Sequence, residues 1–411
     1  AVEQVGAQTA WGRIVQAVEA AESSRAPVER LADRVAGWLV YAALAGATLA
    51  WLLTGDLRAT ISVVLVAGAC GVAAGTPLAL LGAIGRCARA GAVVKGGPPM
   101  EALGEVDTVV FDKTGTLTLG QPVVVALQPA PGVEPTRLLQ ASATAERDSE
   151  HPLARAVLAH AAQAGIAPGA PEGFAYGPGR GVRCRWQGRE LAVGNHLHAS
   201  AGTAAQAAPG RTVLYVAQDG QPLGTLHIED AVRPDTRAAL GRLEAQGLRL
   251  VLLSGDTDAN AKALAARLGI PEAAGGLLPH DKVAAIERLK ADGRRVAMVG
   301  DGINDAPALA RSHVGIAMGG GTDLAAETAG VVLLGSRLEP VVEALEAGRR
   351  CRRIVWQNLV GTLLVDGAGM VLAGLGWLPP IAAGLVHVGS ELAFILNATR
   401  MLPPRRRGAG G

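Results

Sequence analysis

Four long apolar stretches constrain this 411-residue chain more than any other feature. Residues 36–53 and 59–85 contain no Asp, Glu, Lys or Arg, and in residues 354–377 and 381–399 the only ionisable side chains are Asp366, His387 and Glu391. A helix needs about 20 apolar residues to cross the hydrocarbon core of a membrane. Buried helices of a soluble core are the alternative, but four stretches of this length favour membrane spans. The sequence therefore predicts two transmembrane hairpins.

Basic residues flank both hairpins and indicate the orientation of the chain. Arg30 and Arg34 precede the first hairpin, and Arg86, Arg89 and Lys95 follow it. Four arginines within 349–353 precede the second, and residues 405–407 are arginines beyond it. Lys and Arg are enriched in cytoplasmic loops near membrane spans. We therefore predict a multi-pass integral protein of a bacterial cell membrane, with lipid as a partner and residues 86–353 in the cytosol. The formal net charge of +2 gives no indication of a nucleic-acid-binding surface, so no nucleic-acid partner is predicted.

One cytosolic segment, residues 106–116, joins an apolar strand to a reactive turn. The sequence V-D-T-V-V-F leads directly into Asp112-Lys113-Thr114-Gly115-Thr116. Ligands collect at the carboxyl end of a buried parallel strand, so Asp112 is expected at a reaction centre. A carboxylate can attack the γ-phosphorus of ATP when Mg²⁺ and a lysine offset the charge on the transferring oxygens. We interpret Asp112 as this nucleophile; the alternative is a strand-to-turn connection with an incidental aspartate.

Three distant segments fit the same centre. Apolar strands are also expected at 249–253 and 295–299, and they end in Ser254-Gly255-Asp256 and in G-D-G-I-N-D, which contains Asp301 and Asp305. Lys282 could supply a second cation to a phosphoryl group. Helical patterns at 259–269 and 281–290 alternate with these strands, and strands at 314–318 and 330–334 complete an α/β domain with a doubly wound parallel sheet. Asp256 and Asp258 are expected only to cap the helix that follows them.

These motifs, in this order and spacing, resemble the phosphorylation core of the P-type ATPases, which belongs to the haloacid dehalogenase superfamily. The resemblance implies that ATP phosphorylates Asp112. It also implies that Mg²⁺ is held by Asp112, by the backbone carbonyl of Thr114 and by Asp301. The catalytic residues that it implies are Asp112, Lys113, Thr114, Ser254, Lys282 and Asp305.

Residues 122–222 interrupt the catalytic fold, and we expect them to form an α+β nucleotide-binding domain. Glu146, followed by Ser149-Glu150-His151-Pro152, resembles the Ser-Glu-His-Pro signature of the heavy-metal subfamily, and G-P-G-R-G-V (177–182) and Gly194-Asn195 match its glycine turns. Glycine lets a backbone approach a ligand closely, and imidazole can hydrogen-bond to a base. Taken alone, such a His or Gly-x-Gly is more often a helix cap or a turn. The expected ATP contacts are Glu146, His151, Gly179, Gly181 and Asn195.

The resemblance also implies the domain organisation. Residues 1–35 are similar to the end of an actuator domain and its linker, 86–121 and 223–345 form the two parts of the phosphorylation domain, 36–85 and 346–402 are the hairpins, and 403–411 are a basic tail. Asp230 and Arg233 resemble a D-x-x-R-P hinge. The Thr-Gly-Glu loop that hydrolyses the aspartyl phosphate in this family is absent. We therefore expect an N-terminally truncated chain whose partners are the missing actuator and membrane segments. Alone, it is expected to form the phosphoenzyme but not to complete the catalytic cycle.

Residues within the membrane stretches bear on the transported heavy-metal ion. Cys70 stands where related pumps carry Cys-Pro-Cys, and Pro77 and nearby glycines favour a bend there. Asp366, His387 and Glu391 fall near mid-bilayer, where a carboxylate costs several kcal/mol unless it is paired. One thiolate with carboxylate and imidazole suits a divalent ion such as Zn²⁺ better than Cu⁺. Alternatively, the membrane carboxylates Asp366 and Glu391 form structural hydrogen bonds rather than an ion site. For the transported ion, potassium is a further alternative.

Two other functions fit parts of this pattern. A membrane-tethered haloacid-dehalogenase-type phosphatase usually has a second aspartate two residues after the nucleophile, where this chain has Thr114. An inactive metal-binding membrane module would keep the membrane residues without catalysis. Cys70, Cys87, Cys184 and Cys351 form no C-x-x-C pair, which argues against a disulfide framework and a soluble zinc module.

Overall fold

The structure, a computed structural model, describes residues 26–68, 70–177, 180–195, 211–320 and 322–402. The chain divides into two compact units. The first unit comprises Ala1–Val110, Gly241–Arg249 and Pro279–Gly411, and the second comprises Phe111–Leu240 and Leu250–Leu278. The linker expected within residues 1–35 is described only from residue 26, and the basic tail lies outside the described residues.

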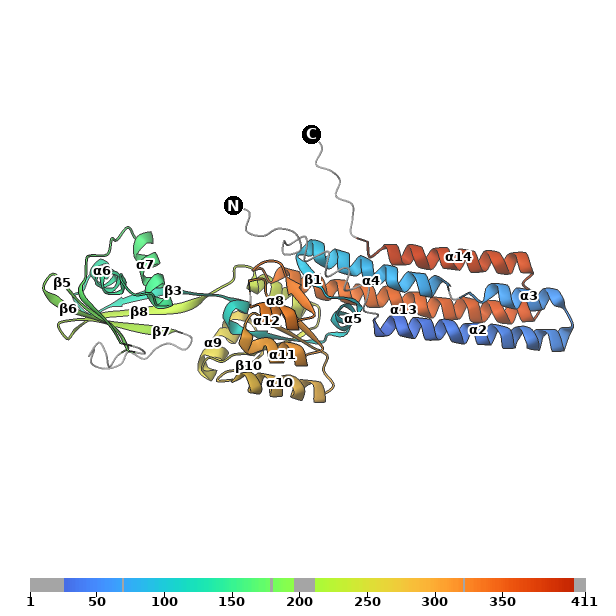
Figure 1. Cartoon of the computed structure of the whole chain (residues 1–411), viewed down its shortest axis with the longest axis horizontal. Helices are drawn as coiled ribbons and strands as arrows, with labels where there is room; N and C mark the ends of the chain where they lie inside the picture. Colours follow the sequence, from blue (N-terminus) through green and yellow to red (C-terminus); the bar gives the residue numbers. More distant parts are fainter. Residues whose placement is uncertain (1–25, 69, 178–179, 196–210, 321, 403–411) are drawn as a thin grey trace, which may run out of the picture. The chain divides into compact units, whose positions relative to one another are not determined.

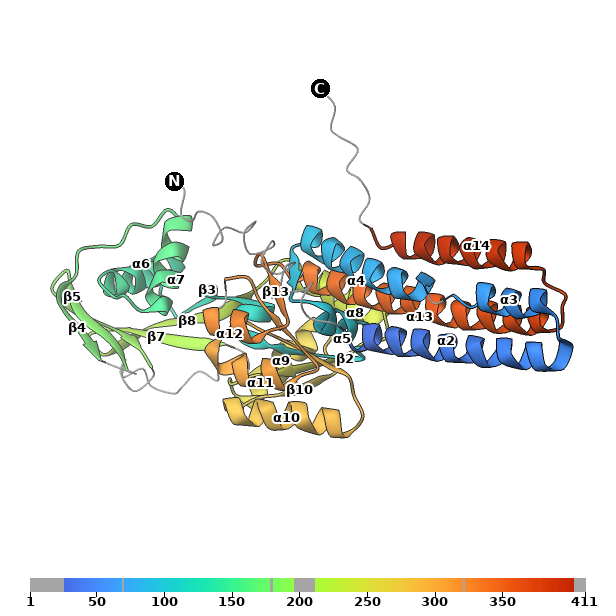
Figure 2. The same cartoon turned by 45° about the vertical axis from the view of Figure 1, so that its right-hand side comes forward.

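The first unit contains the apolar helices, which run side by side in Figures 1 and 2. They are α2 (Pro27–Thr54), α3 (Leu57–Val66), α4 (Cys70–Ala90), α13 (Glu339–Gly374) and α14 (Pro380–Thr399). With α3 and α4 taken together, four stretches are long and apolar enough to cross a membrane. Large apolar side chains such as Trp38, Leu52 and Ile381 are exposed on their surfaces, as lipid-facing residues are. The two predicted membrane hairpins are confirmed.

The second predicted span is not one continuous helix. Helix α3 ends at Val66, and Ala67 leaves the helical region with φ −81° and ψ 86°. A Cβ on Gly68 would lie 1.5 Å from His387 Cε1, so only glycine leaves room for the imidazole there. Pro77 lies inside α4, which continues past it. The expected irregularity near Cys70 is therefore a break before that residue, and Pro77 does not end the helix.

The catalytic sheet of the first unit has the order β1, β13, β12, β11, β2. Their bounds are β1 (Ala92–Val94), β13 (Val331–Leu333), β12 (Val314–Ala317), β11 (Val296–Gly300) and β2 (Thr108–Asp112). Strand β12 is parallel to β11 and β13, and β1 is antiparallel to β13. The helices between these strands are α5 (Gly97–Glu105), α10 (Pro279–Ala291), α11 (Ala306–Arg311) and α12 (Asp323–Thr328). The α/β expectation is confirmed, with one antiparallel edge strand.

Backbone hydrogen bonds align the starts of three strands in the first unit. Asp107 N and Thr108 N donate to Arg295 O at 3.0 and 3.2 Å, and Arg249 N donates to Asp107 O at 2.9 Å. These residues lie at the starts of β2, β11 and β9 (Arg249–Leu253). The three strands therefore begin at one edge.

The second unit is built mainly on a six-stranded antiparallel sheet with the order β3, β8, β7, β6, β5, β4. The bounds are β3 (Thr118–Pro129), β4 (Glu172–Gly177), β5 (Gly181–Trp186), β6 (Arg189–Gly194), β7 (Thr212–Gln218) and β8 (Gln221–Val232). Helices α6 (Pro135–Glu146) and α7 (Pro152–Gln163) cover one face of this sheet (Figure 1). Leu138, Val157 and Leu226 belong to the core between them. The inserted α+β fold is confirmed.

The rest of the second unit carries the end of β2. After Asp112 the chain forms the turn η2 (Lys113–Leu117), and β9 continues beside β10 (Glu272–Ala274) in parallel. Helix α9 (Asp258–Leu268) joins these two strands, and α8 (Thr236–Ala245) follows β8. Asp112 and Ser254 thus both stand just after apolar strand residues.

Candidate functional site

Asp112 ends a fully buried strand and is itself only 6% exposed. The turn after it contains Gly115 with φ 70°, a left-handed conformation that glycine adopts without strain. Ser254, which follows β9, is 1% exposed, and its hydroxyl accepts a hydrogen bond from Asp256 N at 3.1 Å. The buried strands β2 and β9 therefore place the side chains of Asp112 and Ser254 in positions that are almost inaccessible to solvent.

Arg233 fixes the turn that carries Asp112. Its Nε donates to Thr116 O at 2.8 Å, and its Nη2 donates to Gly115 O. Thr236 Oγ1 donates to Leu117 O at 3.0 Å. Arg233 is 6% exposed, so two backbone carbonyls satisfy a buried charged donor group. The sequence identified Arg233 only as part of a hinge, whereas its side chain directly contacts the turn that follows Asp112.

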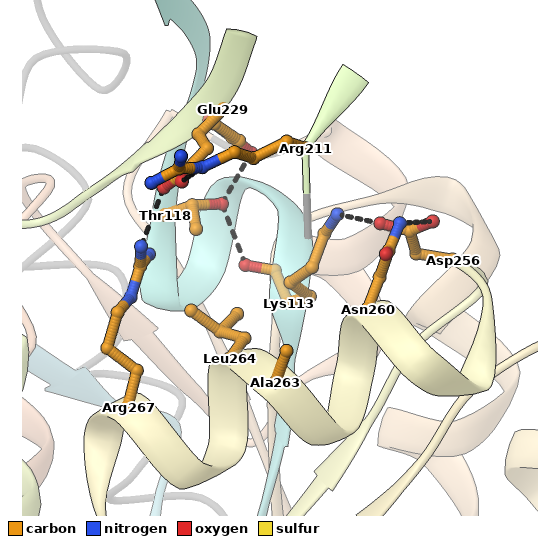
Figure 3. Close-up of a pocket in the computed structure, with 10 residues that line it drawn as sticks. Lys113, Thr118, Arg211, Glu229, Asp256, Asn260, Ala263, Leu264 and Arg267 are labelled. Atoms are coloured by element: carbon orange, nitrogen blue, oxygen red, sulfur yellow. Dashed lines mark hydrogen bonds and ion pairs between the residues drawn. The ribbon is translucent and has the colours of Figure 1, made fainter. Parts of the chain in front are cut away.

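Lys113 pairs with Asp256 rather than pointing into free solution. Lys113 Nζ donates to Asp256 Oδ2 at 2.7 Å, and Asn260 Nδ2 donates to Asp256 Oδ1 at 3.0 Å (Figure 3). Thr257 N also donates to Asp256 Oδ1, at 2.7 Å. Burial alone would raise the pKa of Asp256, but the hydrogen bonds from Lys113, Asn260 and Thr257 lower it below its ordinary value. Asp256 is thus held ionised beside the predicted catalytic lysine.

The expectation that Asp256 and Asp258 cap α9 is wrong. The N-cap is Thr257, whose Oγ1 accepts from Asn260 N at 3.4 Å. Asp258 accepts from Gly275 N at 3.1 Å and pairs with Lys262 at 2.6 Å. Thr257 directly precedes Asp258, the first residue of α9, so it is the residue in position to cap the helix.

A cavity of about 270 Å³ opens beside Lys113. Arg211 and Arg267 both point to Glu229 in its wall, each 2.6 Å from a Glu229 carboxylate oxygen (Figure 3). Burial alone would raise the pKa of Glu229, but the two guanidinium hydrogen bonds outweigh it and lower the pKa. Sequence reasoning missed Arg211 and Arg267, because neither lies in a recognisable motif.

A second cavity, of about 250 Å³, brings together four of the five predicted ATP contacts: Glu146, His151, Gly181 and Asn195. Gly179 lies outside the described residues. Burial raises the pKa of Glu146 to about 7, although a hydrogen bond with Ser149 acts in the opposite direction. His151 is exposed and caps α7, its Nδ1 accepting from Leu153 N at 3.2 Å.

The glycines of this cavity allow close packing between two strands. A Cβ on Gly181 would lie 2.1 Å from Val193 O, and a Cβ on Gly194 would lie 2.1 Å from Arg180 O. Gly181 and Gly194 face each other in the pairing of β5 with β6. Their lack of a side chain therefore serves strand packing at the cavity wall.

The first unit holds a separate lysine–aspartate pair. Lys282 Nζ donates to Asp305 Oδ1 at 2.7 Å, and these side chains are only 6% and 3% exposed. A Cβ on Gly300 would lie 2.8 Å from Asp305 Oδ2, so glycine makes room for this carboxylate. Asp301 follows β11 and is partly buried, and its carbonyl accepts from Thr322 N at 2.9 Å.

Three of the four predicted ion ligands have described side chains. Asp366 on α13 is 1% exposed, and its Oδ2 has no hydrogen-bond partner among the described residues. His387 Nε2 lies 3.9 Å from Glu391 Oε2, one turn away on α14. The imidazole also lies against Gly68, at the break between α3 and α4. The side chain of Cys70 lies outside what the structure describes.

This chain is similar to known proteins. Residues 106–313 match the haloacid dehalogenase-like hydrolases. The probable copper-exporting P-type ATPase V of Mycobacterium tuberculosis is 40% identical over 99% of this chain and 55% of its own length. The manganese-exporting P-type ATPase of Mycobacterium bovis is 38% identical over 97% of this chain and 57% of its own. The chain thus spans about half the length of these curated relatives.

A solved structure resembles the whole described architecture. The crystal structure of a zinc-transporting PIB-type ATPase in its E2.Pi state matches with a TM-score of 0.81 and 34% sequence identity. The match covers 95% of this chain and 67% of that one. On this sequence and structural similarity, the protein belongs to the heavy-metal-transporting P-type ATPases, and its catalytic core is a haloacid dehalogenase-like hydrolase domain.

Proposed function

We propose that this chain carries the ATP-dependent phosphorylation machinery and part of the ion pathway of a heavy-metal exporter, with Asp112 as the phosphate acceptor. One observation carries the proposal. In the second unit Asp112 ends the buried strand β2 and Ser254 follows β9, and an ion pair of 2.7 Å joins Lys113 to Asp256, which lie one and two residues further along the chain. The carboxyl ends of β2 and β9 therefore form one edge that holds a carboxylate, a hydroxyl group and a lysine, as phosphoryl transfer to Asp112 requires.

The proposed reaction is transfer of the γ-phosphoryl group to a carboxylate. An Asp112 oxygen attacks the γ-phosphorus, the bond to the β–γ bridging oxygen breaks, and ADP leaves. Lys113 and Lys282 neutralise charge on the transferring oxygens, Ser254 hydrogen-bonds to the phosphoryl group, and Asp305 holds Lys282 in position. Thr114 stands where related phosphatases have a general acid, which favours a lasting phosphoenzyme.

The residues at this edge also fit Mg²⁺. Carboxylate and carbonyl oxygens are the ligands that Mg²⁺ prefers, and Asp112 is a carboxylate held in a buried position. We propose Asp112, Asp301 and the Thr114 carbonyl as ligands; the bound ion would offset charge on the phosphates.

The two cavities of the second unit suggest how ATP binds. The cavity of Glu146, His151, Gly181 and Asn195 offers a buried carboxyl group and an imidazole to the base. The cavity beside Lys113 contains Arg211 and Arg267, whose planar donor groups suit phosphate oxygens. We therefore assign the adenine to the first cavity and the phosphates to the second.

For the transported ion we propose Cys70, Asp366, His387 and Glu391 as ligands. The names of the relatives include copper, manganese and zinc, so they leave the metal open. A set with carboxylates and an imidazole supports a divalent, zinc-like ion rather than Cu⁺. Since no Thr-Gly-Glu sequence occurs in these 411 residues, we propose that they alone form the phosphoenzyme without sustained hydrolysis.

Labelling with γ-³²P-ATP tests the proposal. We expect a hydroxylamine-sensitive phosphoenzyme that Zn²⁺ stimulates and that Asp112→Asn abolishes. Asp107→Asn is a matched control, because Asp107 precedes the opposite end of β2, and it should label normally. Hydrolysis of phosphomonoesters without a stable label would indicate a tethered phosphatase instead. A chain that takes up no label would be an inactive membrane module.

A further inference from the structure

Most described hydroxyl groups in the membrane helices are satisfied within their own helix. Thr48 Oγ1 donates to Leu44 O at 2.8 Å and Ser62 Oγ donates to Arg58 O at 2.8 Å. The same bond to a carbonyl three or four residues earlier is made by Thr54, Thr60, Ser390 and Thr399. Apolar surroundings offer no water, so this local bond is the usual way to satisfy a hydroxyl group.

Thr362 on α13 departs from this rule. Its side chain is 1% exposed, yet Oγ1 has no hydrogen-bond partner among the described residues. An unsatisfied buried hydroxyl group is destabilising, and a hydroxyl with a purely structural role would avoid this by bonding to the carbonyl of Asn358. The hydroxyl is instead available to a group that the structure does not contain. Thr76 on α4 shares this condition, but Thr362 has a carboxylate one turn away.

The neighbours of Thr362 on the same face of α13 are also polar and buried. Asn358, Thr362 and Asp366 follow one another at intervals of four residues, so they share one face of the helix. All three are at most 1% exposed. Asn358 is satisfied by α14, because its Nδ2 donates to Phe394 O at 3.1 Å and its Oδ1 accepts from Asn397 Nδ2 at 2.8 Å. Thr362 Oγ1 and Asp366 Oδ2 are both left without such a partner in the described structure.

We propose that Thr362 Oγ1 and the Asp366 carboxylate bind the transported ion together. The inference rests on the proposed transport function and adds a ligand to its site. Side chains four residues apart have Cβ atoms about 5–6 Å apart, which is close enough for both oxygens to contact one cation. A hydroxyl and a carboxylate are hard oxygen donors, and they suit Mn²⁺ or Zn²⁺ while adding little for Cu⁺.

Direct ion binding tests this assignment without requiring catalysis. Full-length protein carrying Asp112→Asn would be dialysed to equilibrium against radiolabelled Mn²⁺, Zn²⁺ or Cu⁺. Thr362→Val removes the hydroxyl and keeps the shape, and we expect it to weaken Mn²⁺ and Zn²⁺ binding about tenfold, equivalent to about 1.4 kcal/mol. Thr362→Ser should restore the affinity, and Cu⁺ binding should not change. Thr48→Val, which removes a self-satisfied hydroxyl, is the matched control.

Different outcomes separate the two levels of the argument. If Asp366→Asn weakens binding while Thr362→Val does not, the hydroxyl is not a ligand and the inference is wrong. An equal loss for all three metals, or an equal loss for the Val and Ser variants, would show a packing defect and also overturn it. If Asp366→Asn itself leaves binding unchanged, the ion site of the proposed function fails as well.

Discussion

The two lysines assigned to phosphoryl transfer stand in pairs of the same length but different surroundings. Lys113–Asp256 and Lys282–Asp305 both have N–O distances of 2.7 Å. The first pair lines a cavity, with side chains 17% and 30% exposed, whereas the second is 6% and 3% exposed. A solvated pair contributes little to stability, while a buried ion left without its partner is costly. Distance alone therefore does not tell how firmly a lysine is held.

The difference suggests two separate tasks. Lys282 is fixed, because leaving Asp305 would strand a buried carboxylate. Lys113 can exchange Asp256 for a phosphate oxygen at small cost, because the pair is partly exposed at the cavity. The buried pair would thus keep the sheet edge in shape, and the open pair would respond to the nucleotide.

Breaking the buried pair should have the largest effect. We expect Lys282→Met to lower the free energy of unfolding by about 3–5 kcal/mol, because the buried Asp305 carboxylate loses the cation that pairs with it. Chemical unfolding of the first unit, followed by hydrogen exchange in α10 and β11, would measure this. Lys290→Met on the same helix, whose ion pair with Glu287 is solvated, should change stability little. The double variant Lys282→Met/Asp305→Leu should recover most of the stability and still not label.

The open pair should separate chemistry from stability. We expect Lys113→Met to slow phosphoenzyme formation about 100-fold, because one cation at the transferring phosphoryl group is lost. Its unfolding free energy should fall by less than about 1 kcal/mol. Rapid-quench labelling and thermal unfolding of the same sample provide both numbers. A large stability loss, similar to that of Lys282→Met, would erase the contrast between the pairs.

The smallest effect is the pH dependence contributed by Asp256. Its pKa is lowered in the folded state, so its contribution to stability is complete above the unfolded pKa and is lost as the pH falls through the folded value. Unfolding free energies measured from about pH 5 down to pH 3 should therefore fall slightly more steeply for the wild type than for Asp256→Asn. Parallel curves would mean that the Lys113 contact does not persist in solution.

The sequence predicted the parts of the fold that depend on local patterns. Continuous apolar runs identified β2, β9 and β11 because buried parallel strands need them, and Arg249–Leu253 agrees with the structure at both ends. Stretches without charged residues identified the membrane helices, because a helix that crosses a membrane must be apolar along its length. The antiparallel edge strand β1 was missed, since three residues carry too little pattern to distinguish a strand from a loop.

Contacts of long side chains could not be predicted in this way. Asp256 meets Lys113 across 143 residues, and no local signal distinguishes that role from helix capping. Arg211, which directly precedes β7, and Arg267 on α9 both reach Glu229, and the sequence around them contains no motif for that contact. The ring of His387, which lies over 300 residues later in the chain, packs against Gly68 beside the break at residue 67. Such features are settled by tertiary packing.

Arg233 has a mechanical consequence. It follows β8, which is the last strand of the inserted sheet in sequence, and its guanidinium group donates to two backbone carbonyls of the turn that follows Asp112. A buried guanidinium with two such bonds holds the turn firmly, because moving it away would leave both carbonyls and the positive charge without partners in a buried environment. If ATP binding moves the inserted sheet, Arg233 would also move the turn that carries Asp112. The backbone would then transmit nucleotide binding to Asp112.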